Sequence, residues 1–205
     1  KKKGTGKTMS KHMDVADIQF VTEHFMNSNI PLATKATLLT AWVMLDNTED
    51  ESMGLQYIID HQKDRLPPEL LFLLSAHTDS DFDRLIHSLI QYKSLSEDHI
   101  TAAFDQMIKG TIPSYKIAAF LEGLRLKEES REENATIHRY FCNQTTRLPL
   151  DIPLLVDIAT PYDGFNRSYF LQPFVAALLA SIGIPSILHG VYEVSPKKGM
   201  TTHKL

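Results

Sequence analysis

A polar turn near the C-terminal end of the sequence carries the residues best suited to chemistry. It runs from Thr160 to Arg167 and directly follows an apolar stretch of strand length. Ligands of open α/β sheets bind beyond the C-terminal ends of the strands, where loops and helix N-termini converge. Asn166 and Arg167 could hold an anion there, while Asp163 could orient a metal or a hydroxyl group. The alternative interpretation is that Asp163 and Gly164 only make a tight turn and that Arg167 is a solvated charge.

A second group with chemical potential, His189-Gly190, closes another apolar stretch that is typical of a strand. An imidazole at a strand end can bind phosphate or act as acid or base, and a glycine lets a ligand approach the backbone. A basic, hydroxyl-rich segment from Ser195 to His203, which includes Lys198, follows. It could complete an anion site at the same edge. The alternatives are a structural histidine and a solvated surface loop.

The first residues contain part of a phosphate-binding loop. The segment Gly4-Thr5-Gly6-Lys7-Thr8 ends like such a loop, but Lys1 stands where the motif requires a glycine. We therefore expect a flexible basic arm that leads into a helix.

Charge is distributed unevenly along the chain, whose formal net charge is −4. Five of the 21 basic residues lie within Lys1–Lys11 and three more within Lys197–Lys204. Removing these eight leaves 13 basic residues against 25 acidic ones between His12 and Glu193. The middle of the chain is therefore a poor surface for nucleic acid, and anion binding is expected at the ends.

Composition limits the class of protein. With 205 residues, 43% of them hydrophobic and 22% charged, the chain is neither disordered nor fibrous. The single cysteine, Cys142, excludes an internal disulfide and favours the cytoplasm. The histidines lack metal-ligand spacing, so no zinc site is predicted.

Apolar residues at three-and-four spacing predict that the first part of the chain is helical. Thr48–Glu51 and Ser130–Glu133 match capping boxes, in which two side chains satisfy N–H groups at a helix start. Pro31 fits the first turn of a helix, and Asp79 is expected to cap another. The expected helices in the first ninety residues cover 14–26, 31–45, 48–61, 69–76 and 79–90.

The helical pattern repeats with an offset of 82 residues. Residues 14–51 and 96–133 share Ile, Pro, Ala, Leu and Glu at matched positions, including Pro31 with Pro113 and Glu51 with Glu133. We interpret this as an internal duplication of a helical hairpin. The alternative is that two amphipathic hairpins look alike because helix chemistry is limited.

The chain changes character after Cys142, where prolines divide it into shorter pieces. A strand over 154–159, a buried helix over 170–182 capped by Gly183, and a strand over 185–190 are predicted. Such a unit makes a parallel pair with a right-handed crossover, and both of its strands should be covered on two faces. Polar residues and prolines interrupt the 170–188 stretch too often for it to span a bilayer.

The stretch from Gly110 to Lys127 resembles the N-terminal helical hairpin of anthranilate phosphoribosyltransferase and its relatives in glycosyltransferase family 3, which include the pyrimidine nucleoside phosphorylases. The resemblance covers the chain from about Leu95 onward. It continues through Ser130–Glu133, Asp157-Ile158, Asp163-Gly164, Phe174–Ala177, Gly183–Pro185 and His189-Gly190.

The resemblance implies a helical domain on an α/β domain, a phosphoribosyl diphosphate site with magnesium between them, and dimerisation through the N-terminal helices. The family's Gly-Thr-Gly-Gly-Asp loop is replaced here by Ala159–Asp163, and of its Lys-His-Gly-Asn-Arg motif only His189-Gly190 remains. Losing those glycines removes a close backbone approach to diphosphate. These departures are similar to a divergent branch of anthranilate phosphoribosyltransferase-like proteins, some of which bind nucleic acid.

The sequence thus predicts a fold between the α+β and α/β classes. A helical domain at 1–145 precedes the beginning of a parallel α/β domain of the nucleoside phosphorylase and phosphoribosyltransferase type at 146–205, which is expected to be truncated. The predicted function is a transferase that binds a phosphorylated sugar or nucleotide, such as phosphoribosyl diphosphate, with Mg²⁺ accompanying a diphosphate and an unknown acceptor. The alternative is a catalytically inactive, nucleic-acid-binding member. A cytoplasmic homodimer without membrane contact is expected. The expected phosphate- or substrate-binding residues are Asp163, Gly164, Asn166, Arg167, His189, Gly190 and Lys198.

Overall fold

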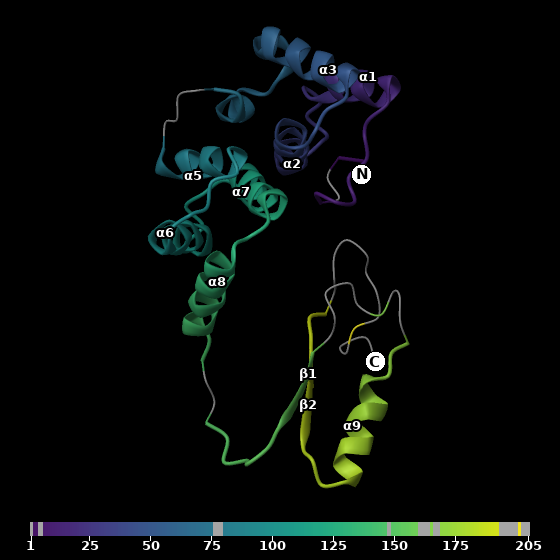
Figure 1. Ribbon diagram of the computed structural model, residues 1–205, viewed down its shortest axis with the longest axis vertical. Coiled ribbons are helices and arrows are strands. Elements are labelled where there is room, and N and C mark those ends of the chain that lie inside the picture. Colours follow the sequence, from purple (N-terminus) through teal and green to yellow (C-terminus); the bar gives the residue numbers. More distant parts are fainter. Residues whose placement is uncertain are drawn as a thin grey trace. The chain divides into compact units, whose positions relative to one another are not determined.

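The computed structural model describes residues 2–3, 6–75, 80–146, 149–159, 165, 169–192 and 201, apart from the side chains of residues 62 and 63. The chain divides into two compact units, residues 1–146 and 147–205. The first is built from helices and the second contains a parallel pair of strands (Figure 1). The predicted fold class, a helical part followed by the start of a parallel α/β part, is confirmed.

Helices account for the described regular structure of the first unit. Both predicted capping boxes are present, at the starts of α3 and α8. Ser80 caps α5, so the prediction of a cap at Asp79 is wrong by one residue; Asp79 itself lies outside the described residues. The helices are α1 (Val15–His24), α2 (Leu32–Met44), α3 (Glu49–Asp60), α4 (Gln62–Arg65), the 3-10 helix η1 (Pro68–Leu73), α5 (Asp81–Ile90), α6 (Glu97–Ile108), α7 (Ser114–Lys127) and α8 (Arg131–Gln144).

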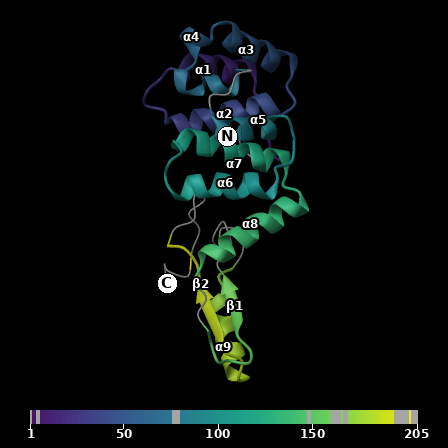
Figure 2. The same cartoon turned by 90° about the vertical axis from the view of Figure 1, so that its left-hand side faces the viewer.

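Helices α2 and α7 pack against each other at the centre of the first unit. Figure 2 shows α1 and α3 on one side of this pair and α6 on the other. Both central helices are apolar around much of their circumference, as buried helices are. Five side chains without solvent exposure form the middle of the core: Leu39, Trp42, Ile86, Leu89 and Phe120. Burying side chains of this size stabilises the fold by roughly 1.5–3 kcal/mol each.

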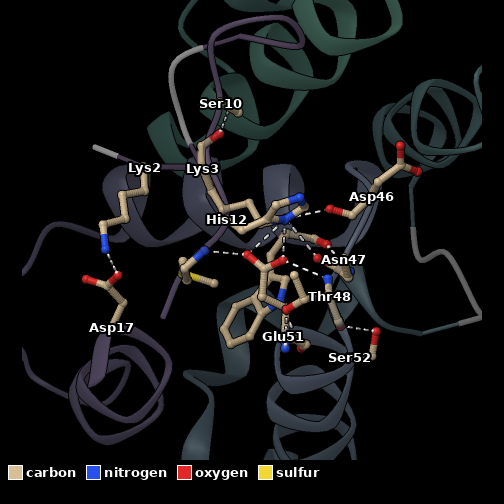
Figure 3. A network of polar contacts seen from close by, with 12 residues as sticks. Lys2, Lys3, Ser10, His12, Asp17, Asp46, Asn47, Thr48, Glu51 and Ser52 are labelled. Atoms are coloured by element: carbon tan, nitrogen blue, oxygen red, sulfur yellow. Dashed lines mark hydrogen bonds and ion pairs between the residues drawn. The ribbon is translucent and has the colours of Figure 1, made fainter. Parts of the chain in front are cut away.

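The carboxylate of Glu51 joins the N-terminal segment to the start of α3 (Figure 3). It has no solvent exposure and accepts hydrogen bonds from the N–H groups of Met13 at 2.7 Å and Thr48 at 2.9 Å. The Lys3 ammonium lies 3.1 Å and the His12 ring 2.8 Å from its oxygens. Lys3 is only 2% exposed, so the expectation of a flexible arm is wrong at this residue. The buried position of the Lys3 charge is tolerated because the Glu51 carboxylate beside it neutralises that charge.

Glu133 repeats this construction in the second half of the helical unit. Its carboxylate accepts hydrogen bonds from the N–H groups of Leu95 and Ser130, both at 2.7 Å, and the Lys127 ammonium lies 2.6 Å away. The backbone donors of Glu51 and Glu133 are separated by the same 82 residues as the glutamates themselves. The predicted duplication of the hairpin stays a prediction, and these contacts are the matched ones that it would produce.

The second unit contains a strand, a helix and a strand in the predicted order. These are β1 (Val156–Ala159), α9 (Gln172–Ser181) and β2 (Ser186–His189). The strands are parallel, with Asp157 opposite Ile187 and Ala159 opposite His189. Gly183 has a φ of +79° and follows α9, where the left-handed conformation that glycine tolerates ends the helix. The predicted parallel pair and glycine cap are confirmed.

The expectation of burial in this unit is wrong for the described residues. Alternate residues of both strands are exposed. In the described part of this unit, a single helix, α9, packs against β2. On α9 itself, Phe174 and Leu178 are each 68% exposed, although the sequence predicted a buried helix. Among the described residues, no helix combines the length and apolar character that crossing a bilayer requires.

Candidate functional site

The two parallel strands bring His189 and Asp157 together on one face. His189 is the last residue of β2, and its Nε2 lies 2.6 Å from Oδ1 of Asp157 in β1. Both side chains lie on the exposed face of the pair and are 54% and 64% exposed, respectively. A carboxylate in this position orients the imidazole. The pair therefore holds a ring nitrogen and a carboxylate together at the exposed face of the two strands.

The N-terminus of α9 lies close to the end of β1. Gln172, the first residue of α9, is 8% exposed, and its side-chain amide donates a hydrogen bond to the carbonyl of Ala159. No side chain caps α9, and Pro173 occupies its first turn. The first N–H groups of a helix carry positive partial charge and bind anions. The helix start and the strand end thus flank the turn that the sequence singled out.

Only two of the predicted site residues fall within the part of the chain that the structure describes. His189 ends β2, and half-buried Gly190 follows it directly. The others, Asp163, Gly164, Asn166, Arg167 and Lys198, lie outside the described residues. Their membership in a site at this strand edge remains a prediction.

Sequence reasoning did not identify two contacts of this edge. It placed Asp157 in a strand without pairing it with His189, and it treated Gln172 only as an interruption of an apolar stretch. The pairing could have been found from the register: residues alternate between the faces of a strand, so Asp157 shares a face with the residue opposite His189.

The N-terminal segment that resembles part of a phosphate-binding loop makes a contact within the protein instead. The Lys7 ammonium lies 3.0 Å from the carboxylate of Glu128, and Gly6 has a φ of +96°. The charge of Lys7 is therefore already partnered, while Gly4 and Thr5 lie outside the described residues.

Acidic side chains do not gather into a metal site in the described part of the molecule. No group of three or more His, Cys, Asp or Glu side chains there could hold a metal ion. Asp157 is engaged with His189 instead. Since hard cations such as Mg²⁺ need several oxygen ligands, the described residues alone do not fit a magnesium ion. We derive no chemical step through one.

The helical unit matches a known kind of domain. Residues 83–139, which cover most of α5, all of α6 and α7 and most of α8, match the helical bundle domain of the glycosyl transferase family. The resemblance to anthranilate phosphoribosyltransferase-like proteins of glycosyltransferase family 3 is therefore confirmed.

Individual relatives are similar over about half of this chain. The anthranilate phosphoribosyltransferase of Streptococcus sanguinis is 27% identical over 115 residues, which are 56% of this chain and 34% of that protein. The one from Synechococcus sp. is 31% identical over 57% of this chain and 34% of its own length. The uncharacterized protein YbiB of Escherichia coli is 29% identical over 49% and 32%. The matched region spans about a third of each relative's length. No solved structure matches.

Proposed function

We propose that the chain, with its helical bundle and its strand–helix–strand unit, is a family-3 glycosyltransferase-like protein that binds a phosphorylated sugar or nucleotide. One observation carries the proposal: a helical bundle of the glycosyl transferase type is followed by a parallel unit in which His189, at the end of β2, contacts Asp157 of β1. The similarity to anthranilate phosphoribosyltransferases supports phosphoribosyl diphosphate as the ligand to test first.

The proposed binding site is the C-terminal edge of β1 and β2. The uncapped start of α9 and the cations Arg167 and Lys198 would receive the phosphate groups, because charge-assisted hydrogen bonds to phosphate are strong. His189, oriented by Asp157, would donate to the diphosphate and stabilise the charge that develops there as its bond to the sugar carbon breaks. Mg²⁺ would arrive with the diphosphate. The proposed ligand-binding residues are Asp163, Gly164, Asn166, Arg167, His189, Gly190 and Lys198.

Phosphoribosyl diphosphate with MgCl₂ is expected to raise the Tm of the protein, since a ligand at a hundred times its Kd stabilises the folded state by about 2.7 kcal/mol. His189→Gln is expected to weaken binding at least about tenfold by removing one charge-assisted hydrogen bond. Differential scanning fluorimetry and titration calorimetry, with and without MgCl₂, measure both effects.

The matched control is His61→Gln, since His61 is an exposed histidine whose ring contacts the Tyr57 carbonyl and the Tyr57 ring one turn earlier. It should bind like the wild type. No thermal shift at millimolar ligand, or equal binding by His189→Gln and wild type, would contradict the proposal.

The nucleic-acid-binding alternative has fewer free cations than the sequence suggested. Of the N-terminal lysines, Lys2 is paired with Asp14 and Asp17, Lys3 is buried against Glu51, and Lys7 is paired with Glu128. Charges held by internal carboxylates contribute less to counterion release from a nucleic acid. The transferase-like proposal is therefore the one we favour.

We also propose that the protein is a homodimer through its N-terminal helices. Exposed apolar side chains on α1 and α3 support this: Val15, Phe20, Met53 and Tyr57 are 62%, 57%, 66% and 39% exposed. Light scattering should give about twice the chain mass of 23.2 kDa, and Met53→Glu should give a monomer. Met9→Glu, on an equally exposed methionine outside these helices, should stay dimeric. A monomeric wild type would refute the dimer.

A further inference from the structure

Glu122, in the second half of α7, is a buried acid that the fold leaves partly unsatisfied. Its side chain is 4% exposed, and its Oε1 atom is buried without a hydrogen-bond partner. Its Oε2 atom lies 3.4 Å from Nη1 of Arg125, one turn further along the same helix. This distance is long for a charge-assisted hydrogen bond, which usually measures about 2.7–2.9 Å. The buried carboxylates of Glu51 and Glu133, in contrast, each accept two backbone hydrogen bonds and face an ammonium group.

The surroundings of Glu122 favour its protonated form. Burial raises the pKa of Glu122, and the charge of Arg125 opposes this effect without cancelling it. An ionised carboxylate with an unpaired oxygen is strongly disfavoured out of water, whereas a neutral carboxyl group is tolerated more easily. When Glu122 loses its proton, a rearrangement that brings a donor to the carboxylate is therefore favoured.

Arg125 is the charged group that acts on Glu122 in the described part of the helical unit. The helices α2 and α5 pack on α7, and the first residues of the chain contact its C-terminal end. Lys35, the charged residue of α2, responds to the charge of Glu69, and Lys11 near the N-terminus is exposed. The other charged or titratable groups of these elements contact different partners: Asp81 with Arg84, Asp83 with Lys116, His87 with the Phe72 carbonyl, Tyr92 with the Met44 carbonyl, Lys7 with Glu128, His12 with Glu51 and Lys127 with Glu133.

Arg125 also contacts the N-terminal strap, which we define as residues 6–12. Its guanidinium packs so closely on Gly6 that a Cβ at this position would lie 2.9 Å from Nη2. The strap forms a turn, in which the Ser10 N–H donates to the Gly6 carbonyl at 2.9 Å. One guanidinium therefore faces the carboxyl group of Glu122 through Nη1 and the backbone of the strap through Nη2.

We propose that Glu122 and Arg125 form a proton-controlled latch, which holds the N-terminal strap on α7 while Glu122 is protonated and loosens the strap when Glu122 ionises. The ionised carboxylate attracts the guanidinium, shortens the 3.4 Å contact and withdraws Arg125 from Gly6. The strap then loses one of its contacts with α7. Because closure favours the protonated acid, closure is complete below the pKa of Glu122 and weakens as the pH rises through it. The latch uses none of the residues of the proposed phosphate site.

Hydrogen–deuterium exchange of the strap amides tests the latch. Glu122→Gln keeps the shape of the side chain but cannot ionise. The ratio of wild-type to Glu122→Gln exchange at each pH cancels the intrinsic pH dependence of exchange and the effect of His12, which both proteins contain. This ratio should be close to one at about pH 4 and should rise about tenfold by about pH 8, the change that a coupling of one pKa unit produces.

Arg125→Met is the second variant, because it removes the guanidinium and keeps Glu122. Its strap should exchange faster than that of the wild type at about pH 4. Its exchange relative to the double mutant Glu122→Gln/Arg125→Met should not change with pH, since the connection between the acid and the strap is lost. Glu23→Gln, on an exposed acid of α1, is the control and should exchange like the wild type at every pH.

The latch is refuted if the ratio of wild-type to Glu122→Gln exchange does not change with pH. It is refuted equally if Arg125→Met retains the pH dependence of the wild type. Should either variant fail to fold, a carbon-13 NMR titration of Glu122 in the wild type decides, and a midpoint at the ordinary value of about 4.3 would overturn the proposal.

Discussion

Replacing Glu51 by glutamine is expected to lower the free energy of unfolding at pH 7 by about 3–5 kcal/mol, the usual cost of breaking a buried ion pair. The carboxylate accepts from Met13 and Thr48 and neutralises buried Lys3 (Figure 3). Glutamine has the same shape but one acceptor oxygen, and its amide group would face other donors. Lys3 would keep its charge in a buried position without a counter-charge.

Urea unfolding followed by circular dichroism measures this loss. The control is Glu23→Gln, because Glu23 is an exposed acid whose carboxylate accepts a hydrogen bond from Gln19; it should change stability by less than about 0.5 kcal/mol. Glu133→Gln should cost a similar amount to Glu51→Gln, since Glu133 holds Lys127 in the same way. A loss below about 1 kcal/mol for Glu51→Gln would show that Lys3 is not buried against Glu51 in solution.

The lowered pKa of the Glu51 carboxylate predicts that the protein loses stability at acid pH. Burial alone would raise the pKa of Glu51, but hydrogen bonds from Met13 and Thr48, together with His12 and Lys3, outweigh it and lower the pKa from 4.5 to about 2. A lowered pKa contributes stability that is complete above about pH 4.5 and is lost as the pH falls towards 2. The stability difference between wild type and Glu51→Gln should therefore shrink by about 3 kcal/mol over this range.

Gly54→Ala is expected to destabilise the protein by about 2 kcal/mol, because α1 and α3 are too close for a methyl group. A Cβ at residue 54 would overlap Cγ2 of Ile18 and lie 3.2 Å from the Trp42 ring. Overpacking costs about 1–3 kcal/mol or more, and the better helix propensity of alanine returns only part of it. Thermal and urea unfolding at a fixed protein concentration measure the difference.

Gly123→Ala is the matched control in a second helix. Its Cβ would lie 3.2 Å from Cβ of Leu89, a tight contact without overlap, so the net change should be near zero. Adding Ile18→Ala to Gly54→Ala removes the overlapping methyl group, and the double mutant should lose less stability than the sum of the two single changes. Additive losses would mean that α1 does not pack on α3 at Gly54.

Local chemistry explains which parts of the fold were predictable. The capping boxes at Thr48 and Ser130 form because each N-cap residue and its glutamate are three residues apart in the sequence. No contact with a distant segment is needed. Gly183 ends α9 for an equally local reason, its left-handed φ. The parallel pairing of β1 and β2 follows from the helix that joins them. The wrong prediction of a cap at Asp79 is an error of one residue at a helix boundary, where sequence signals are weakest.

The candidate site was predictable to a smaller extent. The turn and His189 were chosen because polar residues follow apolar strands, and the structure places His189 at the expected edge. The partner of His189 required the strand register, which joins residues 32 positions apart.

The residues that could do chemistry were visible in the sequence alone, as were most helices, the two capping boxes and the strand–helix–strand order, because caps, periodicity and turns act within a few residues. The burial of Lys3 against Glu51 and the contact of His189 with Asp157 were decided by the tertiary structure. Whether a charge is solvated, paired or left without a partner depends on which distant elements pack around it, and that arrangement sets the energy of the charge.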